Sequence, residues 1–570
     1  MPMVFLGEWC RRYRRRSYWT SLDAKVLPCI WETGQSVEDA HRHVSGLYEN
    51  ALMALTDAMN KIHGVRCQQR YWRILLGPWL RGYISSAYHK YASLVNAFDR
   101  YPALTSYVLS PADFIVPRDT YESERLLSED LYNLQLYSRL FTALGNSFPE
   151  KRWECETQPL EYSDTSIYTK SLKLKMAEGF SYMVYRLFSG KDPIVLRNAY
   201  FSGVAVLKLI AMTKGKVCIG HIRRVQIPLF PVDRVLRRKL KDIVLGGDRF
   251  SSMLPGLISS DMPQCFLEGY GAVKAEANRI RPRKPRAIFS ANSWYYDEAL
   301  KMWAGASIQK GTILLGTQHG GNYGSIKYHP SEDHELSITD RYYSWGWDRP
   351  EDLTKVIPMP ASKLSVRRRL GADPHKDGIL FVSTSYPRYS AGVSPRYNKF
   401  SEYLLWQMRF ANAVSPHIRG KMRVRPHRDD YGWDIAERWK DRFPDMAMES
   451  WDISFWNSLR DCRIYVCDHI ATTFVESLAA DRPTLLFWDP EAEVVRAEAE
   501  PYYDELRTVG ILHDTPERAA ATLNAVYQDV ASWWNDPSRR EARRRFSRRF
   551  ARTSSHAIRD WVAEFTGNLG

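Results

Sequence analysis

The sequence predicts an α/β protein with two doubly wound, Rossmann-like parallel sheets and a helical insertion in the N-terminal half. Short apolar segments that end in polar or glycine residues recur in two series, between residues 194 and 317 and between residues 378 and 489. Helical patterns separate these segments, which is typical of βαβ units. The chain has 570 residues, more than the roughly 250–300 residues that a single hydrophobic core supports.

The N-terminal half begins with a short apolar segment, residues 4–7, which we expect to be a strand that founds the first sheet. From about residue 36 to residue 150, apolar side chains recur at helical spacing. Four strands follow, at 194–196, 217–219, 287–290 and 313–315. A helix that carries Asp297 lies between the last two strands, so these elements predict a βαβ unit and a parallel sheet.

The second series of strands predicts a second α/β domain. Its members are 378–382, 421–424, 463–467 and 484–487. We predict an N-terminal domain over residues 1–349, with the helical insertion at about 36–150, and a proline-punctuated linker over 350–374. A C-terminal domain over 375–538 and a basic C-terminal helix over 539–570 complete the chain.

The formal charge of +15 indicates an acidic partner: nucleic acid, an anionic membrane, or a phosphorylated or carboxylated substrate. Much of the charge lies in two arginine runs, residues 11–16 and 539–552. The eight cysteines are scattered and show no zinc spacing, which favours a reducing cytoplasm. No apolar segment follows the first arginines, so we expect no signal peptide. The longest apolar run, 204–212, contains Lys208 and is too short to span a bilayer.

Residues 317–324 form a glycine-rich turn directly after the strand at 313–315. Gly320, Gly321 and Gly324 would let the backbone adopt a positive φ and approach a ligand closely. His319 projects from the end of the strand, where ligands bind in open α/β sheets. The alternative is that His319 is a structural histidine beside a tight turn.

Residues 468–484 predict a strand end, a hydroxyl-bearing turn, a short helix and a return strand. Thr472, Thr473 and Ser477 would lie at or near the start of that helix, where free N–H groups and the helix dipole favour a phosphate. Glu476 would accept hydrogen bonds from the ribose hydroxyls of a nucleotide. The alternative is a capping box of Thr473 and Glu476. The whole arrangement resembles the nucleotide-sugar site of GT-B glycosyltransferases, and it predicts that the C-terminal domain binds the nucleotide.

Other strand ends of the second domain carry further donor-binding candidates. Arg425 and His427 could neutralise a donor phosphate without a metal, or could belong to a solvated basic loop. Thr384 and Ser385 could bind phosphate or base, or could cap a turn. The sequence contains no P-loop, no dinucleotide G-x-G-x-x-G, no H-E-x-x-H and no G-x-S-x-G motif. NTPases, Rossmann dehydrogenases, zincins and α/β-hydrolases are therefore disfavoured.

A glycosyl transfer needs an acid or base at the acceptor hydroxyl and positive charge or donors at the departing nucleotide. His319 is the first catalytic candidate and Asp297 is the second. Asp297 would supply the carboxylate nucleophile if the reaction proceeded by double displacement. The alternative for Asp297 is a favourable negative charge at the start of a helix.

Five motifs span most of the chain: residues 5–10, 71–80, 318–321 with Tyr323 and Gly324, 343–347 and 472–483. In their joint occurrence the chain resembles a family of transferases encoded in bacterial O-antigen and surface-polysaccharide gene clusters. The resemblance implies a cytoplasmic transferase that makes a surface glycan, and it brings no catalytic residue with it. Some GT-B enzymes of this kind use CMP-linked ulosonic acids, which suggests that donor class by analogy.

The sequence thus predicts a metal-independent glycosyltransferase that needs no cofactor, with a nucleotide-sugar donor and a glycan or lipid-linked glycan acceptor. The first alternative is a polyol-phosphate transferase of the teichoic-acid type with a CDP-activated donor, since such enzymes also have two α/β lobes and histidine-glycine loops. The second is a basic nucleic-acid-binding protein. The sequence has no RNP, helix-turn-helix or zinc-finger signature for it, so we expect no nucleic-acid partner.

The arginine run at 539–552 is the candidate contact with a membrane. Phe546 and Phe550 fall on one face of the predicted helix, which would suit the anionic inner face of the plasma membrane. The alternative is a solvated terminal helix with a small docking face.

Overall fold

The computed structural model describes residues 3–154, 183, 193–220, 227–350, 355–367, 369–390 and 392–567. By their internal contacts they form two compact units. Unit 1 comprises Met1–Asp39, Gln318–Glu332 and Tyr343–Ala557, and unit 2 comprises Ala40–Thr317, Asp333–Tyr342 and Ile558–Gly570. This division differs from the predicted domain ranges, because residues 1–39 and 318–332 group with the C-terminal sheet. The predicted ranges therefore stay predictions.

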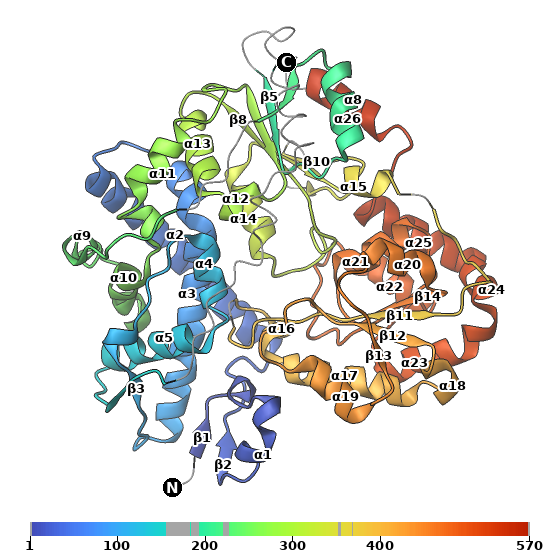
Figure 1. The fold of residues 1–570 in the computed structure, drawn as a ribbon, viewed down its shortest axis with the longest axis horizontal. Coiled ribbons are helices and arrows are strands. Elements are labelled where there is room, and N and C mark those ends of the chain that lie inside the picture. The colour runs from blue at the N-terminus through green and yellow to red at the C-terminus, as the bar shows by residue number, and fades with distance from the viewer. Residues whose placement is uncertain are drawn as a thin grey trace. The chain divides into compact units, whose positions relative to one another are not determined.

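The first six-stranded sheet has the strand order β10-β9-β8-β7-β5-β6 (Figure 1). Its strands are β5 (Ile194–Arg197), β6 (Val217–Ile219), β7 (Ala287–Ser290), β8 (Ile313–Thr317), β9 (Arg341–Ser344) and β10 (Val356–Pro358). β5 pairs in parallel with both β6 and β7, and β7 pairs in parallel with β8. All four strands predicted for this sheet are confirmed. In its core, the Phe289 ring packs against Phe201, Trp561 and Phe565.

The second six-stranded sheet has the strand order β13-β12-β11-β14-β15-β16 and is parallel throughout. Its strands are β11 (Ile379–Val382), β12 (Met422–Arg425), β13 (Ala447–Met448), β14 (Ile464–Cys467), β15 (Thr484–Phe487) and β16 (Leu512–His513). Phe381 of β11 contacts Phe410, Trp439 and Phe487, which fixes the helices against the sheet. Two parallel Rossmann-like sheets are therefore confirmed.

The helical region before the first sheet is also confirmed. It consists of α2 (Gly34–His63), α3 (Gln69–Arg100), α4 (Thr120–Leu126) and α5 (Asp130–Ala143), with a short parallel pair, β3 (Val108–Leu109) and β4 (Glu150–Lys151). The apolar side chains that recur at helical spacing in α2 are buried, namely Val44, Leu47, Tyr48, Ala51 and Leu52. Burial of this stripe is what holds the helices together.

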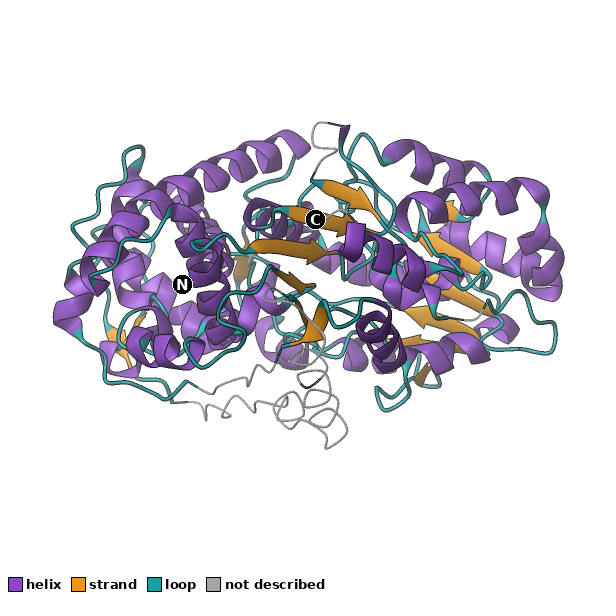
Figure 2. Cartoon of the chain, turned by 90° about the horizontal axis from the view of Figure 1, so that it is seen from above, coloured by secondary structure: helices purple, strands orange, loops and turns teal. Residues whose placement is uncertain are grey.

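Helices connect and flank the strands of both sheets (Figure 2). Those of the first half are α8 (Gly203–Met212), α9 (Arg234–Arg238), α10 (Arg249–Asp261), α11 (Tyr270–Ala277), α12 (Ser293–Tyr296), α13 (Glu298–Ile308) and α14 (Pro330–Ile338). Those of the second half are α15 (Ser362–Ser365), α16 (Pro395–Asn398), α17 (Phe400–Ala413), α18 (Pro416–Arg419), α19 (Ile435–Arg442), α20 (Phe455–Asp461), α21 (Thr472–Ala479), α22 (Glu500–Thr508), α23 (Pro516–Val526), α24 (Val530–Asn535), α25 (Pro537–Phe550) and α26 (Ala557–Gly567). Among the helices of the described residues, none is both long and apolar enough to cross a membrane.

The expectation that the first strand founds the first sheet was wrong. β1 (Met3–Phe5) pairs only with β2 (Ala24–Val26), in a separate two-stranded sheet. The arginine run that follows, residues 11–16, ends where α1 (Arg16–Trp19) begins, and it packs against α19 within unit 1. Arg12 and Arg14 form ion pairs with the buried Asp434, and Arg16 forms one with Asp441. These contacts hold the N-terminal segment in place. Arginines of the run therefore pair with carboxylates of the same chain.

The C-terminal arginine run forms α25, whose apolar face is buried. Phe546 contacts Phe474 and Tyr503, and Phe550 contacts Tyr502 and Tyr503, all within unit 1. Five of the eight arginines in the run form ion pairs, namely Arg539, Arg543, Arg544, Arg545 and Arg549. The structure thus has the solvated helix with a docking face, and the two phenylalanines are not exposed to a membrane. The range predicted as a linker, 350–374, contains β10 and α15.

Candidate functional site

The chain order of the second sheet reverses between β11 and β14. From β11 the sheet continues through β12 and β13 on one side, and through β14, β15 and β16 on the other. Ligands of open parallel sheets bind outside the carboxyl ends of the strands at such a switch point. The segments at this position are residues 383–386, after β11, and residues 468–471, after β14. The switch point is therefore the candidate site of unit 1.

Helix α21 begins at the switch point and has no side-chain cap. Its N-cap residue is Ala471, and the Thr473 hydroxyl accepts a hydrogen bond from the Tyr465 hydroxyl (2.8 Å). The alternative of a capping box is therefore wrong for Thr473. Glu476 forms an ion pair with Lys363 of α15. A helix start whose N–H groups are not capped by its own N-cap side chain favours an anion.

The glycine loop packs directly on this helix start within unit 1. The Gly321 N–H donates a hydrogen bond to Thr472 Oγ1 (3.0 Å). A Cβ atom on Gly321 would lie 2.7 Å from both Ala471 O and Thr472 Cα. A Cβ atom on Gly320 would lie 3.4 Å from Thr472 Oγ1. Close packing against backbone thus requires Gly321.

The reason for the glycines differs from the expected one at two of the three positions. Among Gly320, Gly321 and Gly324, only Gly324 has a positive φ, of 71°. A Cβ atom on Gly324 would also lie 2.4 Å from the Trp347 ring. The loop is therefore built for close approach at Gly321 and for a left-handed turn at Gly324.

His319 is half-buried and interacts with a residue of its own loop. Its Nε2 atom lies 2.7 Å from the Tyr323 hydroxyl. The Tyr323 ring lies 4.2 Å from the His329 ring. Burial lowers the pKa of His329 to about 3, so this imidazole is neutral. Its Nδ1 atom accepts the N–H of Glu332 (3.1 Å).

Gln318 and Glu332 fix the two ends of the loop. The Gln318 side-chain oxygen accepts hydrogen bonds from the Trp345 N–H (2.7 Å) and the Trp347 indole (2.8 Å). The fully buried Glu332 carboxylate accepts the Gly324 N–H (2.6 Å) and forms ion pairs with Arg349 and Arg496. A backbone bridge between Ile326 and Val495 adds to this frame. The loop that carries His319 is therefore held on both sides.

Asp297 lies in unit 2 and caps a helix. Its carboxylate accepts the N–H of Leu300 (3.1 Å), at the start of α13, and forms an ion pair with Arg197 (3.3 Å). Arg197 and Ser290 end β5 and β7, between which the order of the first sheet reverses. Asp297 is thus a negative charge at the start of a helix, which is the alternative given above. Its carboxylate interacts with Leu300 and Arg197, and both interactions are structural.

Three of the predicted donor-binding residues have structural partners. Arg425 is buried and forms an ion pair with Glu449 (2.5 Å), with its guanidinium over the Trp451 ring. The Ser477 hydroxyl is fully buried and pairs with that of Thr484 (2.8 Å). Ser385 donates to Asp430 O (3.2 Å). Arg425 and Ser477 are therefore packing residues in this structure, because neither side chain has surface to offer a ligand.

Thr384 and His427 lie at the same edge of the sheet with different surroundings. The Thr384 N–H donates to the Tyr403 hydroxyl (2.8 Å), and its own side chain is nearly buried. His427 is half-buried, and its Nδ1 atom is 3.1 Å from both the N and the O of Asp429. Its ring stacks on Tyr431, 5.8 Å away. The imidazole of His427 thus lies partly exposed, just after the end of β12.

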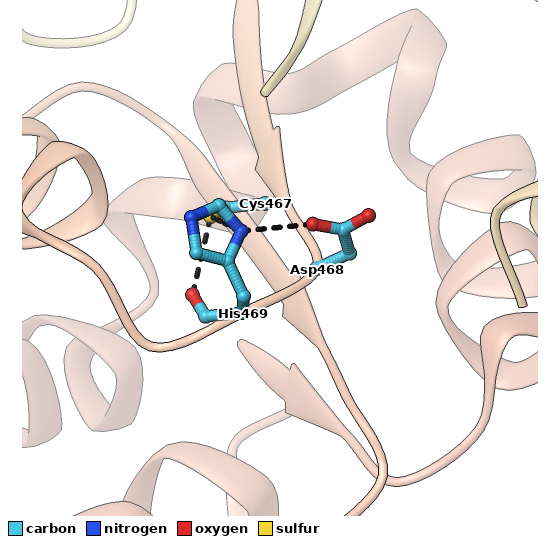
Figure 3. Close-up of side chains that lie close together, drawn as sticks. All are labelled: Cys467, Asp468 and His469. Carbon is cyan, nitrogen blue, oxygen red and sulfur yellow. Dashed lines mark hydrogen bonds and ion pairs between the residues drawn. The ribbon is translucent and has the colours of Figure 1, made fainter. Parts of the chain in front are cut away.

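Three consecutive residues at the end of β14 form a buried cluster (Figure 3): Cys467, Asp468 and His469. The His469 Nδ1 atom is 2.9 Å from Asp468 Oδ1 and 3.5 Å from Cys467 Sγ. Burial opposes the charged imidazole, but Cys467 and Asp468 outweigh it and raise the pKa of His469 to about 10. Among the described residues, these three have ligand atoms close enough together to bind one metal ion, but those atoms already interact with one another.

The cluster is tied to α17 and borders a small pocket. Asp468 accepts hydrogen bonds from the Tyr403 hydroxyl (2.8 Å) and the Gln407 amide (2.9 Å). The pocket beside it, of about 20 Å³, is lined among others by Tyr386, Arg396 and Trp488. This volume has room for about one water molecule.

The sequence did not indicate Gln318, Glu332 or Glu493 as parts of the site. Glu493 forms an ion pair with Arg396 and accepts the Ile470 N–H (3.1 Å), which fixes the loop before α21. Each of these residues acts through a partner far away in the chain. No local pattern marks such a pair, although Gln318 itself lies within the glycine loop.

Replacing Gly321 by alanine is expected to destabilise the loop, because the new Cβ atom would meet backbone atoms that cannot move independently. Overpacking of this kind costs about 1–3 kcal/mol. Thermal unfolding would measure it as a lower midpoint. Gly378→Ala is the matched control, since nothing lies within 4 Å of the position that its new Cβ atom would take. Equal midpoints for both variants would show that the loop does not pack on α21 in solution.

Comparison with known proteins gives the chain a family. The model of the LIC12162 family transferases matches residues 1–565. No curated protein matches the chain. Among solved structures, TarM matches with 13% identity and a TM-score of 0.30, over 49% of this chain and 54% of TarM. The chain thus spans about half the length of TarM.

Two further solved structures show the same level of likeness. The wall teichoic acid polymerase TagF matches with 11% identity and a TM-score of 0.27, over 50% of this chain and 73% of TagF. Anabaena Alr3699/HepE, solved in complex with UDP and glucose, matches with 14% identity and a TM-score of 0.33, over 66% of this chain and 99% of HepE. With nearly its whole length matched by the family model, the chain belongs to the LIC12162 family of transferases.

Proposed function

We propose that this transferase moves a sugar from a nucleotide-activated donor to a surface-polysaccharide acceptor. The observation that carries the proposal is the docking of the His319 loop on the start of α21, at the switch point of the second sheet. One short region thereby combines an uncapped helix start for a phosphate with an imidazole for a hydroxyl proton.

Each group would have a distinct task. The N–H groups at the start of α21 and the hydroxyl of Thr472 would bind the donor phosphates. The imidazole of His427, at the same edge of the sheet, would be a further contact for them. Glu476 would accept the ribose hydroxyls, with Lys363 beside it to offset the phosphate charge. His319 would receive the acceptor proton, and Tyr323 would orient its ring.

The proposal extends to conditions and partners. The reaction would need no metal, because the helix start and cationic side chains balance the leaving-group charge. A CMP-linked ulosonic acid is the donor class suggested by the family resemblance. The acceptor would be a glycan or lipid-linked glycan, reached from the cytoplasmic face of the plasma membrane.

Calorimetry with UDP-, GDP-, CDP- and CMP-sugars tests the proposal. We expect one donor class to bind, and Glu476→Ala to weaken that binding at least about tenfold through loss of two ribose hydrogen bonds. Glu517→Ala is the matched control, since Glu517 forms an ion pair with Arg409 on an exposed helix face. If no nucleotide sugar binds and Glu476→Ala leaves surface glycan unchanged in cells, the proposal is wrong. Phosphate in the product would instead identify a polyol-phosphate transferase.

A further inference from the structure

Helix α8 carries apolar side chains on two opposite faces. Ala205, Leu209 and Ile210 are buried in unit 2. On the outer face, Val204 is 64% exposed, and Leu207 and Met212 are each 48% exposed. These positions follow the spacing of one helical face. α8 lies next to β6, the edge strand of the first sheet. The outer face, defined by residues 204, 207, 208, 211 and 212, has no apolar cover among the described residues.

The outer face of α8 is accompanied by unpaired positive charge. Lys208 lies on it, and Lys214 and Lys216 follow the end of the helix; all three are exposed. Among the described residues, no carboxylate forms an ion pair with any of the three. Residues 193–232 contain no aspartate or glutamate, but they contain six lysines and arginines, of which Arg197 forms an ion pair with Asp297. This part of the chain therefore favours an anionic partner.

We propose that the outer face of α8 rests on the surface of an anionic lipid bilayer. The exposed valine, leucine and methionine side chains would enter the interface between head groups and acyl chains. The lysines would bind the lipid phosphates, and the Lys208 stem would lie along the apolar layer while its ammonium group reaches outward.

Other occupants fit this face less well. The core of a protein interface is depleted in lysine, but Lys208 stands in the middle of the apolar face, one turn from both Val204 and Met212. In a symmetric pair of chains the same patch meets itself. Lys208 would then face its own copy, and like charges repel each other.

This surface differs from the arginine-rich α25, whose phenylalanines are buried. Docking through α8 would bring unit 2 to the lipid-linked acceptors that the proposed function requires. It does not depend on that function, because vesicle binding is measured without donor or acceptor. A chain that binds vesicles but no nucleotide sugar would contradict only the transfer proposal, and the reverse would contradict only this one.

Co-sedimentation with vesicles tests the proposal. Vesicles of phosphatidylcholine alone are compared with vesicles that contain about one third phosphatidylglycerol. We expect the full chain to bind the anionic vesicles, with binding that weakens as salt is added. Leu207→Ser should reduce this binding by roughly tenfold, because it removes an apolar side chain from the interface.

Two variants and one further measurement separate the outcomes. Leu405→Ser is the matched control, since Leu405 is an exposed leucine on α17 of unit 1. Lys208→Gln combined with Lys214→Gln should remove much of the salt dependence. The proposal is overturned if the chain ignores anionic vesicles or if Leu207→Ser and Leu405→Ser bind equally. A dimer in sedimentation velocity that only Leu207→Ser disrupts would assign the face to a second copy and overturn it too.

Discussion

Replacing His319 by alanine is expected to lower kcat for sugar transfer by roughly 10²–10⁴-fold, the usual contribution of a general base. The affinity for the nucleotide donor should change little, because the proposed phosphate contacts come from the start of α21. Transfer is measured as nucleotide release from the donor identified by calorimetry. His417→Ala, on an exposed helix end, is the matched control.

Tyr323→Phe separates a catalytic His319 from a structural one. This variant removes the hydroxyl that lies 2.7 Å from His319 Nε2 and keeps the ring that packs on His329. If Tyr323 orients the imidazole, kcat should fall by about tenfold and the pH profile of kcat should shift. If His319→Ala keeps kcat within about threefold of the unmodified chain, or lowers only the thermal midpoint, His319 is not the base.

Replacing Glu332 by alanine is expected to destabilise the chain by about 3 kcal/mol. The carboxylate is fully buried and balances Arg349 and Arg496, so its removal leaves two positive charges without their partner. Loss of one member of a buried ion pair costs about 3–5 kcal/mol. The lower end applies here, because both arginines are about a quarter exposed.

Thermal unfolding checks this prediction through the midpoint of the transition. Glu332→Gln should recover part of the loss, because an amide oxygen can still accept the Gly324 N–H. Glu541→Ala is the control, since Glu541 forms an exposed ion pair with Arg544. A Glu332→Ala midpoint equal to that of Glu541→Ala would mean that the carboxylate does not hold the loop.

Local patterns predicted most of the two sheets. Residues 313–315 and 464–467 are continuous apolar runs followed by glycine or polar residues, and a fully buried parallel strand needs that pattern. The short strands β9, β10, β13 and β16 escaped prediction, because a run of only two to four residues has too little periodicity to mark a strand by itself. Their strand conformation comes from pairing with a neighbour.

The sequence predicted many residues of the candidate site, but it did not predict which residues contact one another. The sequence singled out the His319 loop and the start of α21 because glycine, histidine and threonine at strand ends are local features. It assigned Arg425 and Ser477 to the donor, whereas burial against Glu449 and Thr484 makes them packing residues. The sequence does not distinguish a side chain that binds a ligand from one of the same type that pairs with a residue far along the chain.

The sequence by itself determined that this chain has two parallel α/β sheets, a helical region before them, and glycine-rich and hydroxyl-rich turns at their strand ends. Hydrophobic periodicity and turn chemistry act over a few residues, so they are visible in one sequence. Only the tertiary structure decided that residues 318–332 belong with the second sheet, and that the arginine runs pair within the chain. Those outcomes depend on ion pairs and close packing between residues that the sequence keeps far apart.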